Sequence, residues 1–213
     1  MMISEQTIER IVNQVMAELT SSPSQSIPIE LSARHVHLSQ KDVDLLFGGK
    51  LTVERELSQP DQFLCKEKVR LIGPRGIIDR VAVLGPVRKQ SQVEISLTDA
   101  RTLGTETPLR QSGDINGTPG VVLASPHGIV SLEQGLIIAG RHIHMPEADA
   151  EQFRVSDGDL VAVHVKGKRP VIMEDVLVRV SDNFSLAMHI DLDEGNGCGC
   201  INNTPAVIFE KEC

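Results

Sequence analysis

The sequence predicts a mainly β fold made of two small closed β-barrels that are related by pseudo-symmetry. Short apolar runs separated by Gly and Pro turns begin at residue 27 and continue along the 213-residue chain. The chain has five Phe and no Trp or Tyr, so its core must consist of Val, Ile and Leu, and β-branched residues favour strands. An Arg-His-aliphatic-His unit occurs at residues 34–37 and again at 141–144, which indicates a duplicated plan. A pair of β-sandwiches is the alternative fold.

The first predicted element is an amphipathic helix over residues 3–20. Its apolar residues recur at helical spacing, and Ser4 is a suitable N-cap. The next residues, 21–26, have the composition of a linker. Two interpretations remain open: a helix that packs on its own protein or on a dimer mate, and a recognition helix that binds in a partner's groove.

The first half of the chain then alternates strands with two short helices. One helix is expected over residues 40–47, with Ser39 as N-cap, Asp42 at the reciprocal position and Gly48 as its end. The other is expected over residues 98–103 and is closed by Gly104. Strands are expected at residues 51–57, 68–73, 77–85, 93–97, 121–124 and 129–132.

The second half repeats this order. A strand is expected at 136–145, followed by a helix that Pro146 opens and that carries Glu147 and Asp149 in its first turn. In both halves, therefore, a short helix follows the histidine unit. Further strands are expected at 160–165, 171–180 and 186–190, with an acidic turn after the last one.

Composition excludes several kinds of partner. The net charge of −8 argues against nucleic acid, so an anionic ligand would have to meet a local group of arginines. The chain has no apolar stretch of 18 residues, and its four cysteines follow no secreted-domain pattern, so we expect a cytoplasmic protein without a membrane segment. Cys198 and Cys200 are interpreted as a structural or incidental pair, because a lone C-x-C is a weak metal or redox signal.

The two histidine units are candidate metal ligands. In an extended strand His35 and His37 point to the same side, and so do His142 and His144. Neutral imidazole is a common ligand of transition metals, so each unit could offer two ligands to one small region.

Other polar residues are weaker candidates on spacing alone. His189 stands at a strand end and Glu94 in a strand-like run, where a structural histidine and a solvent-facing glutamate are the ordinary interpretations. Arg34, Arg141 and Arg88 lie near the histidine units in sequence or motif. A guanidinium suits phosphate or carboxylate, although a surface ion pair is the ordinary role of any single arginine.

Six motifs together resemble the PduL-type phosphate propanoyltransferases, the phosphotransacylases of bacterial microcompartments. The resemblance runs in order from about Pro28 to Asn196 and covers nearly the whole chain. The motifs are Arg34-His-Val-His-Leu-Ser39, Gly85-Pro-Val-Arg-Lys-Gln-Ser-Gln-Val-Glu-Ile-Ser96, Thr98-Asp-Ala-Arg-Thr-Leu-Gly104, Gly117-Thr-Pro-Gly120, Arg141-His-Ile-His-Met145 and Met188-His-Ile-Asp-Leu-Asp-Glu194.

The resemblance implies an enzyme that converts a short acyl-CoA, propanoyl-CoA or acetyl-CoA, and phosphate into acyl phosphate and CoA. It implies two zinc ions between the barrels, with CoA as co-substrate, and it assigns phosphate binding to Arg88. The implied zinc ligands are His35, His37, Glu94, His142, His144 and His189. The implied CoA contacts are Leu31, Ser32, Ala33, Arg75 and Asn196. A second basic position of the family falls at Ala82, where Arg80 is the nearest substitute. Asp191 and Asp193 are available to orient the ligand histidines.

The resemblance also implies a domain order and a location. One barrel would comprise residues 27–33 and 140–213, and the other, residues 34–139, would be an insertion. Residues 1–22 resemble an encapsulation-type helix and linker, which would bind shell or core proteins of a microcompartment, such as one for propanediol degradation. A homodimer is expected.

Two other functions fit the same residues. A dinuclear zinc hydrolase would use the ligands to activate water instead of phosphate. A metal-binding scaffold protein would use them without catalysis, although structural zinc sites are usually closed by four protein ligands.

Overall fold

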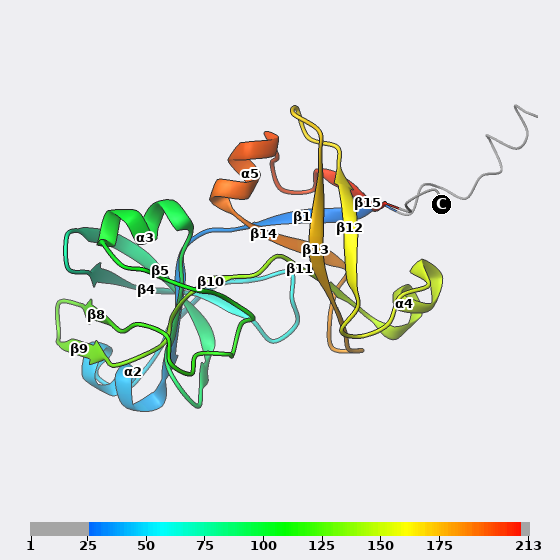
Figure 1. Ribbon diagram of the computed structural model, residues 1–213. Coiled ribbons are helices and arrows are strands. Elements are labelled where there is room, and N and C mark those ends of the chain that lie inside the picture. Colours follow the sequence, from blue (N-terminus) through cyan, green and yellow to red (C-terminus); the bar gives the residue numbers. More distant parts are fainter. Residues whose placement is uncertain (1–25, 210–213) are drawn as a thin grey trace, which may run out of the picture.

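The computed structural model describes residues 26–209, and it confirms the mainly β fold (Figure 1). Two sheets lie side by side, and each has its own hydrophobic core. The predicted helix over residues 3–20 lies outside the described residues. No helix in the described part of the chain is long and apolar enough to cross a membrane.

One sheet is a closed barrel of six strands in the order β1-β14-β11-β13-β12-β15. Strand β1 runs parallel to β14 and antiparallel to β15, so the strand that precedes the first histidine unit completes a barrel whose other strands begin at residue 142. The strands are β1 (Ile27–Ser32), β11 (His142–Met145), β12 (Leu160–Val165), β13 (Val171–Val180), β14 (Ala187–Asp191) and β15 (Pro205–Ile208).

The other sheet has nine strands and is an open half-barrel, whereas a second closed barrel was expected. Helix α2 packs beside the edge strand β9, and the Ser125 hydroxyl donates to the Leu46 carbonyl, so the edge is covered instead of paired. The strands are β2 (His35–Ser39), β3 (Val53–Glu56), β4 (Phe63–Ile72), β5 (Ile77–Arg88), β6 (Gln92–Glu94), β7 (Leu109–Arg110), β8 (Val121–Ala124), β9 (Ile129–Leu132) and β10 (Leu136–Ala139).

Three of the four described helices were predicted: α2 (Gln40–Phe47), α3 (Leu97–Leu103) and α4 (Glu147–Phe153). Ser39 caps α2 and Gly48 ends it in the left-handed conformation. Asp42 does not close a capping box, because its carboxylate accepts hydrogen bonds from the hydroxyls of Ser39 and Ser91.

The prediction of an acidic turn after β14 was wrong, because residues Leu192–Cys198 form helix α5. Asp191 and Glu194 make a reciprocal capping box that starts the helix, although Gly195 and Gly197 argue against one in the sequence. The glycine at 195 lets α5 lie close on β1, since a Cβ there would come within 2.4 Å of a Leu31 methyl carbon.

The strand expected at residues 136–145 is two strands, β10 in the open sheet and β11 in the barrel. The chain therefore passes between the sheets at residues 140–141. Two short strands, β7 and β15, were not predicted.

The two halves share one pairing scheme. Strand β2 lies between β5, to which it is parallel, and β6, to which it is antiparallel. Strand β11 lies in the same way between β13 and β14. The duplication seen in the sequence thus extends to the direction of neighbouring strands.

Gly73, in the turn between β4 and β5, is expected to be essential for packing the turn against α3. A Cβ at Gly73 would lie 2.4 Å from the Leu103 carbonyl oxygen, so Gly73→Ala should lower the free energy of unfolding by about 1–3 kcal/mol. Urea unfolding measures this change. Gly197→Ala is the matched control, because a Cβ there meets nothing within 4 Å, and it should stabilise α5 by less than about 1 kcal/mol. An equal change in the free energy of unfolding for the two variants would contradict the close approach of Gly73 to the Leu103 carbonyl oxygen.

Candidate active site

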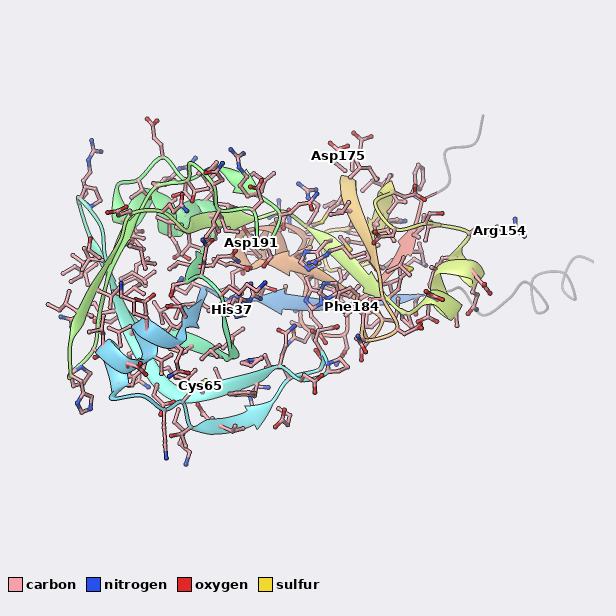
Figure 2. All side chains as sticks on the ribbon, turned by 90° about the horizontal axis from the view of Figure 1, so that it is seen from below. His37, Cys65, Arg154, Asp175, Phe184 and Asp191 are labelled. Carbon is pink, nitrogen blue, oxygen red and sulfur yellow. The ribbon has the colours of Figure 1, made fainter. Side chains whose placement is uncertain are left out.

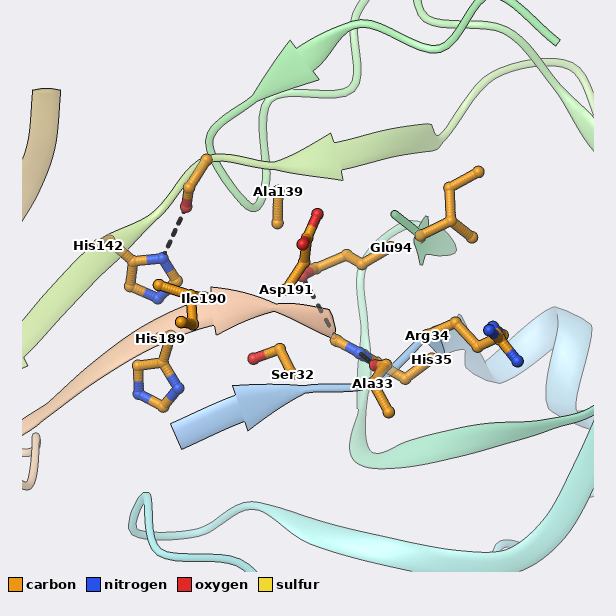
Figure 3. Close-up of a pocket in the computed structure, with 12 residues that line it drawn as sticks. Ser32, Ala33, Arg34, His35, Glu94, Ala139, His142, His189, Ile190 and Asp191 are labelled. Carbon is orange, nitrogen blue, oxygen red and sulfur yellow. Dashed lines mark hydrogen bonds and ion pairs between the residues drawn. The ribbon is translucent and has the colours of Figure 1, made fainter. Parts of the chain in front are cut away.

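Two clusters of candidate metal ligands lie between the sheets, one on each. Figure 3 shows two members of each cluster, His35 with Glu94 and His142 with His189. In the first cluster, ligand atoms of His35, His37 and Glu94 all lie within 4.8 Å of one another. In the second, those of His142, His144 and His189 meet the same limit. The clusters contain all six residues that the family resemblance proposed as ligands.

Strand pairing explains how each cluster forms. Glu94 on β6 lies directly opposite His35, and His189 on β14 lies directly opposite His142. Side chains directly opposite in an antiparallel pair point to the same face, as do residues i and i+2 of one strand. Each His-x-His unit thus receives its third candidate ligand from its antiparallel neighbour.

Backbone carbonyls orient the first histidine of each unit. The Nδ1 of His35 lies 2.8 Å from the Ala33 carbonyl oxygen, and that of His142 lies 2.9 Å from the Gly140 oxygen. Since a carbonyl only accepts, Nδ1 carries the proton and Nε2 keeps its lone pair for the cluster.

The expectation that Asp191 and Asp193 orient the histidines was wrong. Asp191 accepts a hydrogen bond from the Glu194 backbone N–H and caps α5. Asp193, on α5, accepts a hydrogen bond from the Thr98 N–H at the start of α3, so it connects the helices of the two halves. The carboxylate nearest His189 is Glu30, whose Oε2 lies 3.7 Å from its Nδ1.

The residues fit a bound transition metal. Within the described residues, both ring nitrogens of His144 and the Nε2 of His189 are buried without a hydrogen-bond partner. Buried polar atoms normally have partners, and a cation would satisfy a free lone pair. Three imidazoles in one cluster, and two imidazoles with a carboxylate in the other, are donor sets that zinc accepts.

The protonation states also fit a cation. Burial, together with the neighbouring imidazoles, lowers the pKa of His144 to about 2 and that of His189 to about 3. Burial likewise lowers the pKa of His142 and holds the pKa of His37 well below its usual range. These imidazoles are therefore uncharged at neutral pH, as metal ligands must be.

Arg88, at the end of β5, adjoins the first cluster. Its NH2 donates to the His37 Nε2 at 2.9 Å, and its NH1 donates to the Ser112 hydroxyl at 3.2 Å. Ser112 in turn donates to Glu94 at 2.7 Å. Burial acts to raise the pKa of Glu94, but His35 and other neighbours offset this and hold it at about 2, so Glu94 is a carboxylate.

Arg34 and Arg141 form ion pairs, which was the ordinary interpretation. Arg34 NH2 lies 2.9 Å from Asp99, in the capping box of α3. Arg141 Nε lies 2.9 Å from Glu194, in the capping box of α5. The same arginine position therefore fixes the same helix start in both halves.

A cavity of about 520 Å³ contains both clusters and Arg88. Its volume is typical of a small-molecule site. Leu31, Ser32 and Ala33 also line it, as does Ala82. Arg75, in the turn after β4, and Asn196, on α5, lie outside it, so the structure does not bring these two residues to the clusters.

Sequence reasoning missed Arg179 and Phe184, which also line the cavity. Arg179 on β13 is the register partner of His144. The Phe184 ring stacks on the His144 ring with 4.0 Å between centroids. Neither residue belongs to a motif, and only the parallel pairing of β11 with β13 brings Arg179 to the site.

Fold and site together define a mainly β protein with a candidate two-metal centre between its sheets and an arginine, Arg88, beside that centre. Residues 28–201 match the sequence model of the phosphate propanoyltransferase family. The chain belongs to that family, which confirms the resemblance seen in its motifs.

Several relatives carry the name phosphate propanoyltransferase. That of Alkaliphilus metalliredigens is 51% identical over 198 residues, which cover 91% of this chain and 93% of the relative. That of Clostridioides difficile is 48% identical over 208 residues, which cover 96% of this chain and 100% of the relative. That of Thermotoga maritima is 50% identical over 204 residues, which cover 94% of this chain and 95% of the relative.

We expect the metal-free protein to bind two divalent ions, one per cluster, and His144→Ala to bind one. Loss of one imidazole leaves the second cluster two candidate ligands, too few for stable binding. Titration with Co²⁺, followed by absorbance, and metal analysis after zinc loading measure the stoichiometry. His127→Ala is the control, because His127 is exposed in the turn before β9. Two ions bound by His144→Ala would remove His144 from the candidate ligands.

Proposed function

We propose that this protein is a phosphate propanoyltransferase, which converts propanoyl-CoA and phosphate into propanoyl phosphate and CoA, reversibly, and also accepts acetyl-CoA. The main support is Arg88, which lies beside two three-ligand clusters in one cavity. The names of the relatives agree with this activity.

We propose further that the enzyme uses two zinc ions. His35, His37 and Glu94 would hold one ion, and His142, His144 and His189 the other. Bound zinc supplies a Lewis acid that polarises an oxygen of phosphate or of the thioester. Three protein ligands per ion leave room for substrate, which favours a catalytic site over a structural scaffold.

The residues of the chain would position phosphate for direct attack. The Arg88 guanidinium would offer parallel N–H donors to phosphate oxygens. Its NH1 donates to the Ser112 hydroxyl, which donates to Glu94, and these hydrogen bonds hold the guanidinium beside the first cluster. A phosphate oxygen then attacks the thioester carbon, the new C–O bond forms, and the C–S bond breaks as CoA leaves. Holding both reactants in one cavity removes much of the entropic cost of their encounter.

A covalent acyl-enzyme is not part of this proposal. The three cysteines in the described residues, Cys65, Cys198 and Cys200, are buried, and none of them lines the cavity. Burial also raises the pKa of the Cys65 and Cys200 thiols to about 11, which makes them poor nucleophiles.

The CoA assignments divide into two groups. Leu31, Ser32 and Ala33 line the cavity and would contact the acyl end and the pantetheine arm. Arg75 and Asn196 lie outside it, so they would contact only the nucleotide end of a CoA molecule that extends over the surface.

We propose that the two sheets correspond to two domains, residues 27–33 with 140–213 and residues 34–139, in a chain that forms a homodimer. The pairing of β1 with β14 and β15 supports the division. We also propose that residues 1–22 direct the enzyme to the shell or core of a microcompartment in the cytoplasm.

Arg88→Ala is expected to lower the rate of phosphate-dependent thiol release from propanoyl-CoA roughly 100- to 1,000-fold, because a positioned donor to the reacting anion is lost. Zinc content should stay unchanged. Thiol release is followed with and without phosphate. Arg70→Gln is the control, because Arg70 forms an exposed ion pair with Asp79 across β4 and β5 and does not line the cavity. Equal rates of thiol release with and without phosphate in the wild type would identify a hydrolase instead.

Deleting residues 1–22 is expected to leave this activity within about two-fold, because the first residue that lines the described cavity is Glu30. Co-localisation of a fluorescent fusion with shell proteins should be lost. Co-localisation that persists after the deletion would assign targeting to another part of the chain.

A further inference from the structure

A second, smaller cavity of about 190 Å³ opens onto the same centre. Three arginines line it, Arg110, Arg141 and Arg179, against one carboxylate, Asp175. Figure 2 shows Asp175 at the edge of the molecule and Phe184 nearer its middle. This cavity therefore has a positive lining in a protein whose net charge is −8.

The two cavities share three of their lining residues, Ser112, His142 and Arg179. Ser112 is the hydroxyl that binds Arg88 and Glu94, and His142 belongs to the second cluster. The smaller cavity thus meets the second cluster at His142 and adjoins the first through Ser112, and its lining does not include Leu31, Ser32 or Ala33.

Arg179 is held at the junction of the cavities. It lies opposite His144 in the parallel pairing of β11 with β13. Its guanidinium carbon stands 5.7 Å from the centroid of the Phe184 ring, and that ring stacks on His144. The cation–π contact fixes the guanidinium beside the second cluster.

The other two arginines have acidic partners. Arg141 pairs with Glu194 at 2.9 Å, and Arg110 pairs with Asp114 at 3.6 Å in an exposed pair that neutralises little. Arg179 also lines the larger cavity, together with Arg88. Two guanidiniums that face one centre repel each other, and an anion between them would relieve this repulsion.

We propose that the smaller cavity is the route and holding site for inorganic phosphate, and that Arg179, which lines both cavities, contacts the phosphate where it meets Arg88 of the larger cavity. Acyl-CoA would occupy the larger cavity at the same time. This rests on the proposed function. A volume of 190 Å³ is small for the CoA nucleotide but ample for phosphate, and separate routes let both substrates be present before reaction.

Steady-state kinetics of Arg179→Gln test this proposal. We expect the KM for phosphate to rise roughly 10- to 100-fold, as loss of a charge-assisted contact predicts, while the KM for propanoyl-CoA stays within about two-fold. In the reverse direction the KM for propanoyl phosphate should rise and that for CoA should not. Arg179→Lys should recover part of the loss, zinc content should be unchanged, and Arg70→Gln is the control.

A second variant tests the route without changing the centre. Leu109 lies on the wall of the smaller cavity and is 65% exposed, so Leu109→Trp would narrow the opening. We expect kcat/KM for phosphate to fall severalfold and kcat/KM for propanoyl-CoA to stay unchanged.

A rise in the KM for propanoyl-CoA alone, or an equal rise in both KM values, would overturn the proposal and assign Arg179 to the phosphates of CoA. An unchanged KM for phosphate in both Arg179→Gln and Leu109→Trp would overturn it as well. If Arg179→Gln proves inactive, the kcat/KM for phosphate of Leu109→Trp decides whether the smaller cavity is the phosphate route. Failure of the proposed function can be distinguished from failure of this proposal, because the wild type would then release thiol from propanoyl-CoA without phosphate.

Discussion

The antiparallel pairing of each histidine strand with its neighbour is the constraint on which the site depends. It sets Glu94 opposite His35 and His189 opposite His142. A slip of one residue would turn the third candidate ligand to the other face of the sheet. Helix α3 follows β6 and helix α5 follows β14. Each helix opposes such a slip, because the acid in its capping box, Asp99 or Glu194, forms an ion pair with the arginine before the histidines, Arg34 or Arg141.

The two halves share this plan but differ in charge. The third candidate ligand is a carboxylate in one half and an imidazole in the other. The residue opposite the second histidine is Leu84 in the first half and Arg179 in the second. The first half supplies its guanidinium from Arg88, at the end of the same strand as Leu84. Each sheet thus contributes one arginine to the centre from a different position.

The sequence predicted most strands, three helices and the four paired histidines, because each depends on local spacing. Glu94 and His189 required the family resemblance, since which face a lone strand residue occupies is decided by pairing with a distant strand. Arg179 depends on parallel pairing in the same way and was missed. Helix α5 was missed because its glycines oppose a helix locally, whereas Gly195 serves a contact with Leu31 that only the tertiary structure shows.

The position of β1 has a consequence for how the chain folds. Ile29 pairs with Met188, so the barrel cannot close until residues almost 160 positions apart meet. All strands of the half-barrel lie between residues 35 and 139, and this sheet can form while the chain is still being synthesised. The half-barrel can therefore serve as a folded platform before β14 arrives. The second cluster is complete only when β14 pairs with β11 and brings His189 opposite His142.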